Sequence, residues 1–394
     1  MSVFAAVMTG KGTGAISTIE VFGDSAEAVI KRIFKPTGKK TAILKPGKIL
    51  VGVINDASQT IDQVTIGCEG RNNFTINCHG NPLIVEMIMR LLSKEGAKLV
   101  TTKEFLAKTL RAEKRSNTIG IEAKLAQIRA KTIEGAKIIA NQIDGGLSKK
   151  TTEWLQNFDA ISLDGIKKEA EWILEVSQTA RLIIGGCTVV IAGPPNSGKS
   201  TLLNCLAGRE KAIVTEIQGT TRDWVSAECE LGPVAMKLID TAGLGQKLTA
   251  GAKDTIGRAA QQKSVQMLEG ADLILFVIDN SQAAKQVDEK LIGRITNKKV
   301  LTILNKCDLP AKFDTRKLPA ILGDTVEISA KFVTGIESLL KKIQEVLEVA
   351  GFDSKQPVCI TKRQENLLKQ LKKAKSKSDG ASIITELLNG RLGV

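Results

Sequence analysis

One short segment in the middle of the chain has the residue types and spacing needed to hold phosphate groups. Residues 193–200 read GPPNSGKS and fit the pattern G-x-x-x-x-G-K-[ST], between a β-branched run at 188–192 and an apolar stretch that starts at 201. In such a loop the glycines let the backbone wrap phosphate oxygens, and the following helix presents free N–H groups. Lys199 would reach the β- and γ-phosphates, and the Ser200 hydroxyl would coordinate magnesium. The predicted phosphate-binding residues are Asn196, Ser197, Gly198, Lys199, Ser200 and Thr201.

Three further segments follow predicted strands, where the ligand-binding residues of a parallel sheet gather. In 240–243 (DTAG) the Asp240 carboxylate can hold magnesium through water, and the Gly243 amide can contact the γ-phosphate. In 305–308 (NKCD) the Asp308 carboxylate can accept hydrogen bonds from two donors of guanine, one of which adenine replaces by an acceptor. In 329–331 (SAK) the Ala330 backbone can meet guanine O6. The order of the four segments predicts a GTP-binding domain. Its base-binding residues are Asn305, Lys306, Asp308, Ser329, Ala330 and Lys331.

A polar segment between the first two motifs, GTTRD at 219–223, has the character of a switch. Thr221 can supply a second magnesium ligand and close over the γ-phosphate. The alternative is a solvated polar loop. In the first interpretation Lys199 and Thr221 both take part in GTP hydrolysis.

The surrounding pattern predicts a multidomain protein with an N-terminal α+β domain, an all-α helical domain and an inserted α/β P-loop GTPase domain. Apolar stretches at 15–22, 49–54, 64–68 and 74–78, with helices near 25–34 and 82–95, indicate an α+β domain at 1–110. Helical spacing predicts a second domain made of 111–186 and 351–394. Between its two halves, β-branched runs at 188–192, 234–239, 272–278, 300–304 and 325–328 predict a mostly parallel sheet in a GTPase domain at 187–350.

Composition excludes several other classes of protein. The 394 residues have a formal net charge of +14. Seven scattered cysteines and a single histidine argue against a zinc site, a disulfide framework and a histidine-dependent hydrolase. There is no run of eighteen apolar residues and no charged start before the first apolar stretch, so we expect a cytoplasmic protein without a membrane span.

The same segments resemble the MnmE (TrmE) family of tRNA-modification GTPases. GPPNSGKST, TEIQGTTRD, DTAGL and NKCD are close to the family's forms, and so is Cys78-His79-Gly80 followed by an amphipathic helix. The resemblance implies a potassium ion that replaces an arginine finger, held by Asn196, Thr215, Ile217 and Thr220. It also implies a carboxylate that orients the attacking water. The matching residue is Asp254, where the family has Glu, and the alternative is a solvated Asp at a helix start.

The resemblance has departures as well as matches. The family binds a formyl-tetrahydrofolate in its N-terminal domain. Here a basic position of that site is Glu20 and an acidic one is Thr75, while Lys114 is retained, so folate binding is doubtful. His79 is then expected to be a hydrogen-bonded structural residue and not a catalyst. The sequence also ends NGRLGV without the family's Cys-Ile-Gly-Lys type of tail, which suggests a diverged and shortened member.

Two hypotheses of function follow. The first is a GTPase that works in modification of the tRNA wobble uridine. The family implies a homodimer through the N-terminal domain and an MnmG-type flavoprotein partner. Segments 103–150 and 351–394 carry +11 of the net charge of +14, which suits the phosphates of tRNA or forms a solvated surface. The second hypothesis is a diverged regulatory or RNA/ribosome-associated GTPase switch without the modification chemistry.

Overall fold

The structure is a computed structural model that describes residues 2–10, 12–37, 45–57, 59–70, 72–112, 117–208, 225–240, 266–283, 286–287 and 289–392. The chain forms two compact units, one of residues 1–117 with 392–394 and one of residues 118–391. Among the described residues, no helix has the length and apolar character needed to cross a membrane.

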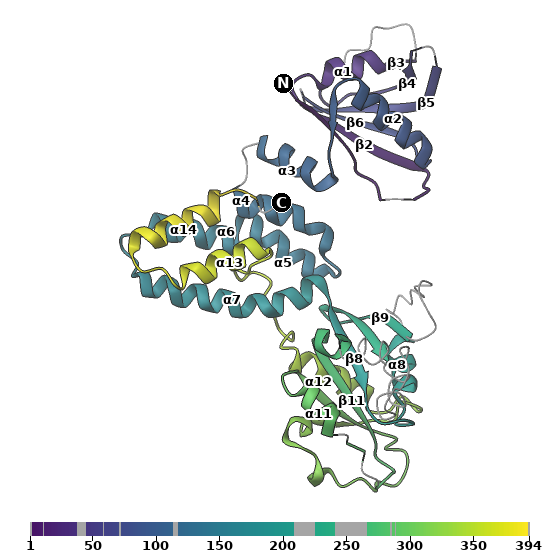
Figure 1. The fold of residues 1–394 in the computed structure, drawn as a ribbon, viewed down its shortest axis with the longest axis vertical. Coiled ribbons are helices and arrows are strands. Elements are labelled where there is room, and N and C mark those ends of the chain that lie inside the picture. Colours follow the sequence, from purple (N-terminus) through teal and green to yellow (C-terminus); the bar gives the residue numbers. More distant parts are fainter. Residues whose placement is uncertain are drawn as a thin grey trace, which may run out of the picture. The chain divides into compact units, whose positions relative to one another are not determined.

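The first unit is built on a seven-stranded mixed sheet in the order β3-β4-β5-β6-β2-β1-β7 (Figure 1). Alternation along the strands turns Ile19, Val21 and Ile76 to the buried face, which α1 and α2 cover. The strands are β1 (Val3–Val7), β2 (Ile16–Phe22), β3 (Phe34–Pro36), β4 (Ile49–Asp56), β5 (Gln59–Gly70), β6 (Asn73–His79) and β7 (Ala97–Leu99). The helices are α1 (Ala26–Ile33), α2 (Pro82–Lys94) and α3 (Thr102–Ala112).

This unit confirms the expected α+β domain class. The four apolar stretches are present as β2, β4, β5 and β6, and the two helices as α1 and α2. The edge strands β3 and β7 and the strand β1 were not expected. Two of these are only three residues long, and VFAAV in β1 lacks the period-2 alternation that indicates a strand.

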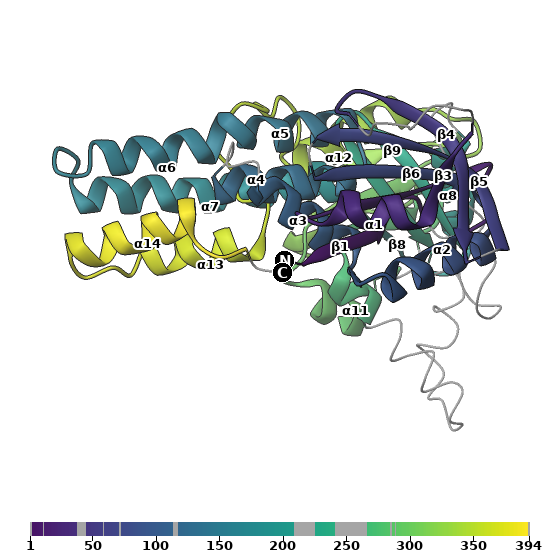
Figure 2. The ribbon, with the colours of Figure 1, turned by 90° about the horizontal axis from the view of Figure 1, so that it is seen from above.

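The second unit begins with a helical region made of two segments far apart in the sequence. Figure 2 shows α6, α7, α13 and α14 running alongside one another. Their shared core includes Trp154, Ile173 and Leu368, and Arg363 at the start of α13 holds the buried Glu122 of α4 at 2.7 Å. The helices are α4 (Thr118–Ala126), η1 (Gln127–Arg129), α5 (Ile133–Asp144), α6 (Gly146–Gln156), α7 (Leu163–Gly185), α13 (Lys362–Leu371) and α14 (Lys377–Asn389).

The rest of this unit is a six-stranded sheet in the order β13-β12-β11-β8-β10-β9. All neighbours are parallel except β9, which pairs antiparallel with β10. Apolar cores lie on both faces, one including α8 and α12 and the other α11 and η3. Strands buried on both faces need continuous apolar runs, as in LILFVI of β11. The elements are β8 (Cys187–Ala192), α8 (Lys199–Ala207), β9 (Val225–Leu231), β10 (Val234–Asp240), β11 (Leu273–Asp279), α11 (Glu289–Ile295), β12 (Val300–Asn305), η2 (Thr315–Lys317), η3 (Ala320–Leu322), β13 (Thr325–Glu327) and α12 (Ile336–Val346).

The expected mostly parallel sheet is confirmed, and β8, β10, β11, β12 and β13 lie at the five predicted runs. The edge strand β9 was not expected, although its sequence VSAECEL has the period-2 alternation of apolar and polar residues that indicates a strand. Such alternation is typical of an edge strand with one solvated face.

Candidate nucleotide site

The phosphate loop connects β8 to α8 and needs glycine at two positions. Gly193 has φ of +141°, and a Cβ there would lie 2.2 Å from the Val277 carbonyl oxygen of β11. Gly198 caps α8 with φ of +97°, and a Cβ there would lie 2.1 Å from Asn305 Nδ2. Both glycines let the loop lie flat against the neighbouring strands, with the first N–H groups of α8 at its end. This is the arrangement that binds phosphate through the backbone.

Ser197 inside the loop has a side chain that suits a polar ligand. The residue is fully buried, and its hydroxyl has no hydrogen-bond partner in the part of the chain that the structure describes. A buried hydroxyl without a partner is costly, because it has lost water without gaining a replacement. A ligand with hydrogen-bonding groups in the loop would remove that cost.

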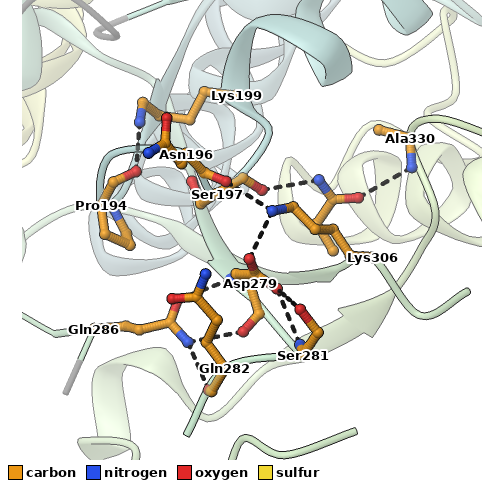
Figure 3. A network of polar contacts seen from close by, with 11 residues as sticks. Pro194, Asn196, Ser197, Lys199, Asp279, Ser281, Gln282, Gln286, Lys306 and Ala330 are labelled. Atoms are coloured by element: carbon orange, nitrogen blue, oxygen red, sulfur yellow. Dashed lines mark hydrogen bonds and ion pairs between the residues drawn. The ribbon is translucent and has the colours of Figure 1, made fainter. Parts of the chain in front are cut away.

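Lys199 and Ser200 are the first two residues of α8 and face different partners. Lys199 is 5 % exposed, and its Nζ donates to the Pro194 carbonyl at 2.6 Å across the loop (Figure 3). Burial lowers the pKa of Lys199, and the neighbouring Asp240 carboxylate raises it in part. The Ser200 hydroxyl donates to Asp240 Oδ2 at 2.6 Å, at the end of β10. The structure therefore brings Lys199, Ser200 and Asp240 together, as the sequence predicts.

Asn305 at the end of β12 ties the phosphate loop to the segment after β13. Its Nδ2 donates to the Ser197 carbonyl at 2.9 Å, and its Oδ1 accepts from the Ala330 amide at 3.0 Å. Asn305 is 2 % exposed, so both bonds are shielded from water. The Ala330 amide predicted to meet guanine O6 is thus held by Asn305 in this structure.

Lys306 has a partner that the sequence motifs do not include. Its Nζ donates to the Asn196 carbonyl at 2.9 Å and forms an ion pair with Asp279 Oδ2 at 2.6 Å (Figure 3). Although burial raises the pKa of Asp279, hydrogen bonds from Lys306 and Ser281 lower it more strongly, so the carboxylate stays charged. Asp279 is the last residue of β11, whose six preceding residues are all apolar. An acidic residue at the carboxyl end of a buried parallel strand was the signal available in the sequence.

The predicted base-recognition residues lie beside this network. Ser329 Oγ donates to Asp308 Oδ1 at 2.5 Å, which fixes one carboxylate oxygen and leaves the exposed Asp308 at the surface of the site. Lys331 is exposed, with its Nζ 5.1 Å from the centre of the Phe332 ring. Thr201 is exposed on the first turn of α8. Several other predicted residues lie outside the described residues: Thr215, Ile217, Thr220, Thr221, Gly243, Asp254 and Lys114.

The predicted folate residues lie on the sheet face opposite α1 and α2. Glu20 on β2 is paired in register with Thr75 on β6, whose hydroxyl donates to Glu69 at 3.1 Å. Burial, and then the carboxylate of Glu69, raise the pKa of Glu20. These residues do not fit an anionic folate. His79 ends β6 with its ring exposed and its Nδ1 2.7 Å from Asp62 Oδ1.

A phosphate loop between a strand and a helix, a buried lysine and an Asn-Lys-x-Asp segment at the ends of parallel strands define a P-loop GTPase. Residues 188–306 match the family described as 50S ribosome-binding GTPase, and residues 3–114 match the family described as GTP-binding protein TrmE N-terminus. The nucleotide that this P-loop GTPase domain binds is therefore GTP.

Relatives along the whole chain identify the family. A Bacillus velezensis protein named tRNA modification GTPase MnmE is 31 % identical over 90 % of this chain and 84 % of its own length. The Bacillus subtilis protein of the same name is 30 % identical over 95 % of this chain and 89 % of its own. The chain belongs to the MnmE family. A solved structure of Aquifex aeolicus Era bound to GDP and AlF4⁻ covers 46 % of this chain and 64 % of its own, at 28 % identity and a TM-score of 0.32.

Proposed function

We propose that this protein hydrolyses GTP in the course of modifying tRNA at the wobble uridine. The proposal rests on two features that occur together in this chain: a TrmE N-terminal segment and a GTP site whose residues contact one another. Relatives named tRNA modification GTPase match the chain over more than four fifths of their own length. In this proposal the GTPase domain, 187–350, is inserted into a helical domain of 111–186 and 351–394.

Magnesium fits the oxygen atoms at the end of β10. The Ser200 hydroxyl and the Asp240 carboxylate lie 2.6 Å apart, and these are hard oxygen ligands of the kind that Mg²⁺ prefers. We expect Ser200 and Asp240 to hold the ion when GTP is bound, with Thr221 as a further ligand. The ion would neutralise charge on the β- and γ-phosphates. Lys199 binds the same phosphates as a buried, charge-carrying donor.

The remaining catalytic roles rest on the resemblance to the family. Asn196 has φ of +60° in the phosphate loop, with its carbonyl accepting from Lys306. Together with Thr215, Ile217 and Thr220 it would hold potassium, which supplies positive charge where an arginine finger otherwise would. Asp254 would orient the attacking water. The base is selected by Asp308, because a carboxylate left without its two guanine donors is disfavoured.

The proposed partners follow the same reasoning. The family implies a homodimer through the N-terminal domain and an MnmG-type flavoprotein that shares the reaction. Transfer RNA would be bound by the basic helical segments through its phosphates. We do not expect formyl-tetrahydrofolate to bind, because Glu20 stands where the resemblance implies a basic residue and Glu69 adds a second carboxylate near it.

Nucleoside analysis of tRNA from cells lacking this gene tests the proposal. We expect the wobble-uridine modification to disappear and to return when the wild-type chain is supplied. Lys199→Ala should fail to restore it. Lys341→Ala removes an exposed lysine of the same domain, on α12, and should restore it fully. An unchanged nucleoside profile in the deletion strain would reject a role in tRNA modification.

A second candidate is a regulatory or ribosome-associated GTPase switch without modification chemistry. Glu20 favours it, since the resemblance implies a basic residue at that position of the folate site. The same deletion strain separates the two candidates. A normal tRNA profile combined with altered ribosome sedimentation would favour the switch.

A further inference from the structure

A cavity of about 330 Å³ lies where the helical region meets both of its connections to the GTPase domain. One wall is the end of α4 with η1, the second is the last turn of α7, and the third is the segment 359–362 with Glu365. The last turn of α7 leads into β8, and segment 359–362 leads back from the GTPase domain into α13. A ligand that fills the cavity therefore contacts both connections. The volume is within the range of small-ligand sites.

The rim of the cavity carries more positive than negative charge. Arg129, Arg181 and Lys362 line it, together with a single carboxylate, Glu365. Lys362 at 3.0 Å, Arg181 at 3.5 Å and Lys369 at 2.5 Å all contact that carboxylate. Hydrogen bonds from Lys369 and then Lys362 lower the pKa of Glu365 to about 2. Glu365 therefore stays ionised, and the cations around it compensate its negative charge.

Two features add to the attraction for an anion. Arg129 is exposed at the rim and has no carboxylate partner in the part of the chain that the structure describes. The helix α13 begins at Lys362, capped by Thr361, whose hydroxyl accepts from the Gln364 amide. The first N–H groups of a helix carry partial positive charge and favour anions.

The floor of the cavity is apolar. Ala126, Ile184 and Ile360 line it with Cys359, which is buried. Burial raises the pKa of the Cys359 thiol to about 12, so it stays neutral. A charged rim over an apolar floor suits a ligand that joins a phosphate to a sugar or a base.

Several other lysines of the helical region already have a hydrogen-bond or ion-pair partner. Lys150 contacts Glu169 at 3.1 Å, and Lys372 forms an ion pair with Glu171. Lys377 Nζ donates to the Asp159 carbonyl at 3.1 Å. The cavity rim is different, because its cations outnumber the carboxylate that they share.

We propose that this cavity binds the phosphate group of a nucleotide, supplied either by an RNA chain or by a free nucleotide. Arg129, Arg181 and Lys362 would bind the phosphate, and the apolar floor would accept the attached sugar or base. The site is separate from the GTP site and does not depend on a role in tRNA modification.

Binding to the full-length protein with its GTPase site saturated with GDP tests the proposal. The probes are an unmodified tRNA transcript and AMP, compared across wild type, Arg129→Gln, Arg181→Gln and Lys168→Gln. The control residue Lys168 is exposed on α7, the helix that carries Arg181, and lies outside the cavity. An affinity for GDP unchanged from wild type shows that each variant is folded.

Each rim variant should weaken at least one probe about tenfold, as expected for loss of a charge-assisted hydrogen bond. Lys168→Gln should change either affinity less than about twofold. A loss for tRNA alone identifies RNA as the source of the phosphate, and a loss for AMP identifies a free nucleotide. Absence of binding by both probes, or equal losses in the rim variants and the control, would overturn the proposal.

Discussion

The GTP site and the sheet face that carries Glu20 lie in segments that both match their family, yet they differ in how many of the predicted ligand-binding residues they keep. At the GTP site Asn305 alone joins the Ser197 carbonyl to the Ala330 amide, at 2.9 and 3.0 Å. On the sheet face Glu20 stands where the resemblance implies a basic residue, and the carboxylate of Glu69 lies close enough to raise the pKa of Glu20. A family match therefore identifies the fold of a domain, whereas the ligand that the domain binds depends on the individual residues of its site.

The physical reason lies in how the two sites are built. The GTP site relies on backbone groups and on side chains that are buried and bonded to one another, so a change at one position disturbs several contacts. The sheet face relies on side chains that project from strands, where a single substitution reverses the charge without disturbing the sheet. Glu20, for instance, keeps its place opposite Thr75 in the β2–β6 register.

The largest effect should come from Lys199→Ala. Lys199 is buried in the phosphate loop and supplies a positive charge that water cannot replace. We expect GTP hydrolysis to fall about a thousandfold and GTP affinity to fall as well. Turnover of GTP by the purified protein measures the first and titration calorimetry the second. Lys341→Ala should leave both unchanged, and equal behaviour of the two variants would remove Lys199 from the site.

Asp308→Asn should change which base is bound. The Asp308 carboxylate is held by Ser329 Oγ at 2.5 Å, and the amide would present a donor where guanine also presents donors. We expect GTP affinity to fall about a hundredfold while xanthosine triphosphate becomes the preferred nucleotide. Competition between the two nucleotides measures this directly. A variant that still prefers guanine would contradict the assignment of Asp308.

Replacing potassium by sodium should slow hydrolysis about thirtyfold at equal ionic strength. A site whose oxygens are spaced for K⁺ would not hold the smaller, more strongly hydrated Na⁺, so the positive charge beside the phosphates would be missing in the transition state. The comparison needs only wild-type protein and phosphate release measured in the two salts. Equal rates would reject a catalytic role for potassium. Asn196 would then be a loop residue whose carbonyl accepts a hydrogen bond from Lys306.

Asp254→Ala should slow hydrolysis about tenfold and spare GTP affinity, since a residue that orients water contributes to the reaction and not to binding. Asp254→Glu, which restores the family's residue, should keep the rate at or above that of wild type. A wild-type rate in the alanine variant would make Asp254 an ordinary solvated residue.

The sequence predicts the GTP site better than its surroundings, for reasons visible in particular residues. The motif at 193–200 constrains backbone shape as well as side chains, because Gly193 and Gly198 need positive φ, so one pattern specifies the loop and its neighbours. Asp279 was not predicted, because its role depends on an ion pair with Lys306. The two residues follow different strands, β11 and β12, and only the fold brings them together. The short edge strands β3 and β7 were not predicted for a similar reason. They are strands because they pair with a neighbouring strand, and their local sequence pattern does not indicate this.

The cavity at the helical junction could not have been predicted either. Its rim joins η1, the end of α7 and the start of α13, and only the folded chain brings Arg129 and Arg181 together with Lys362. The net charge of +14 is compatible with an anionic partner and with a solvated surface. It does not show which lysines are already paired with carboxylates and which cations remain for a ligand.

Titration of one protein preparation with a non-hydrolysable GTP analogue in magnesium, and then with formyl-tetrahydrofolate, tests the comparison most directly. We expect saturable binding of the GTP analogue and no binding of the folate. We expect the same pattern for His79→Ala, whose side chain is an exposed partner of Asp62. Saturable binding of formyl-tetrahydrofolate to the wild-type protein would contradict the account, because it would show that the sheet face has kept its ligand despite Glu20 and Glu69.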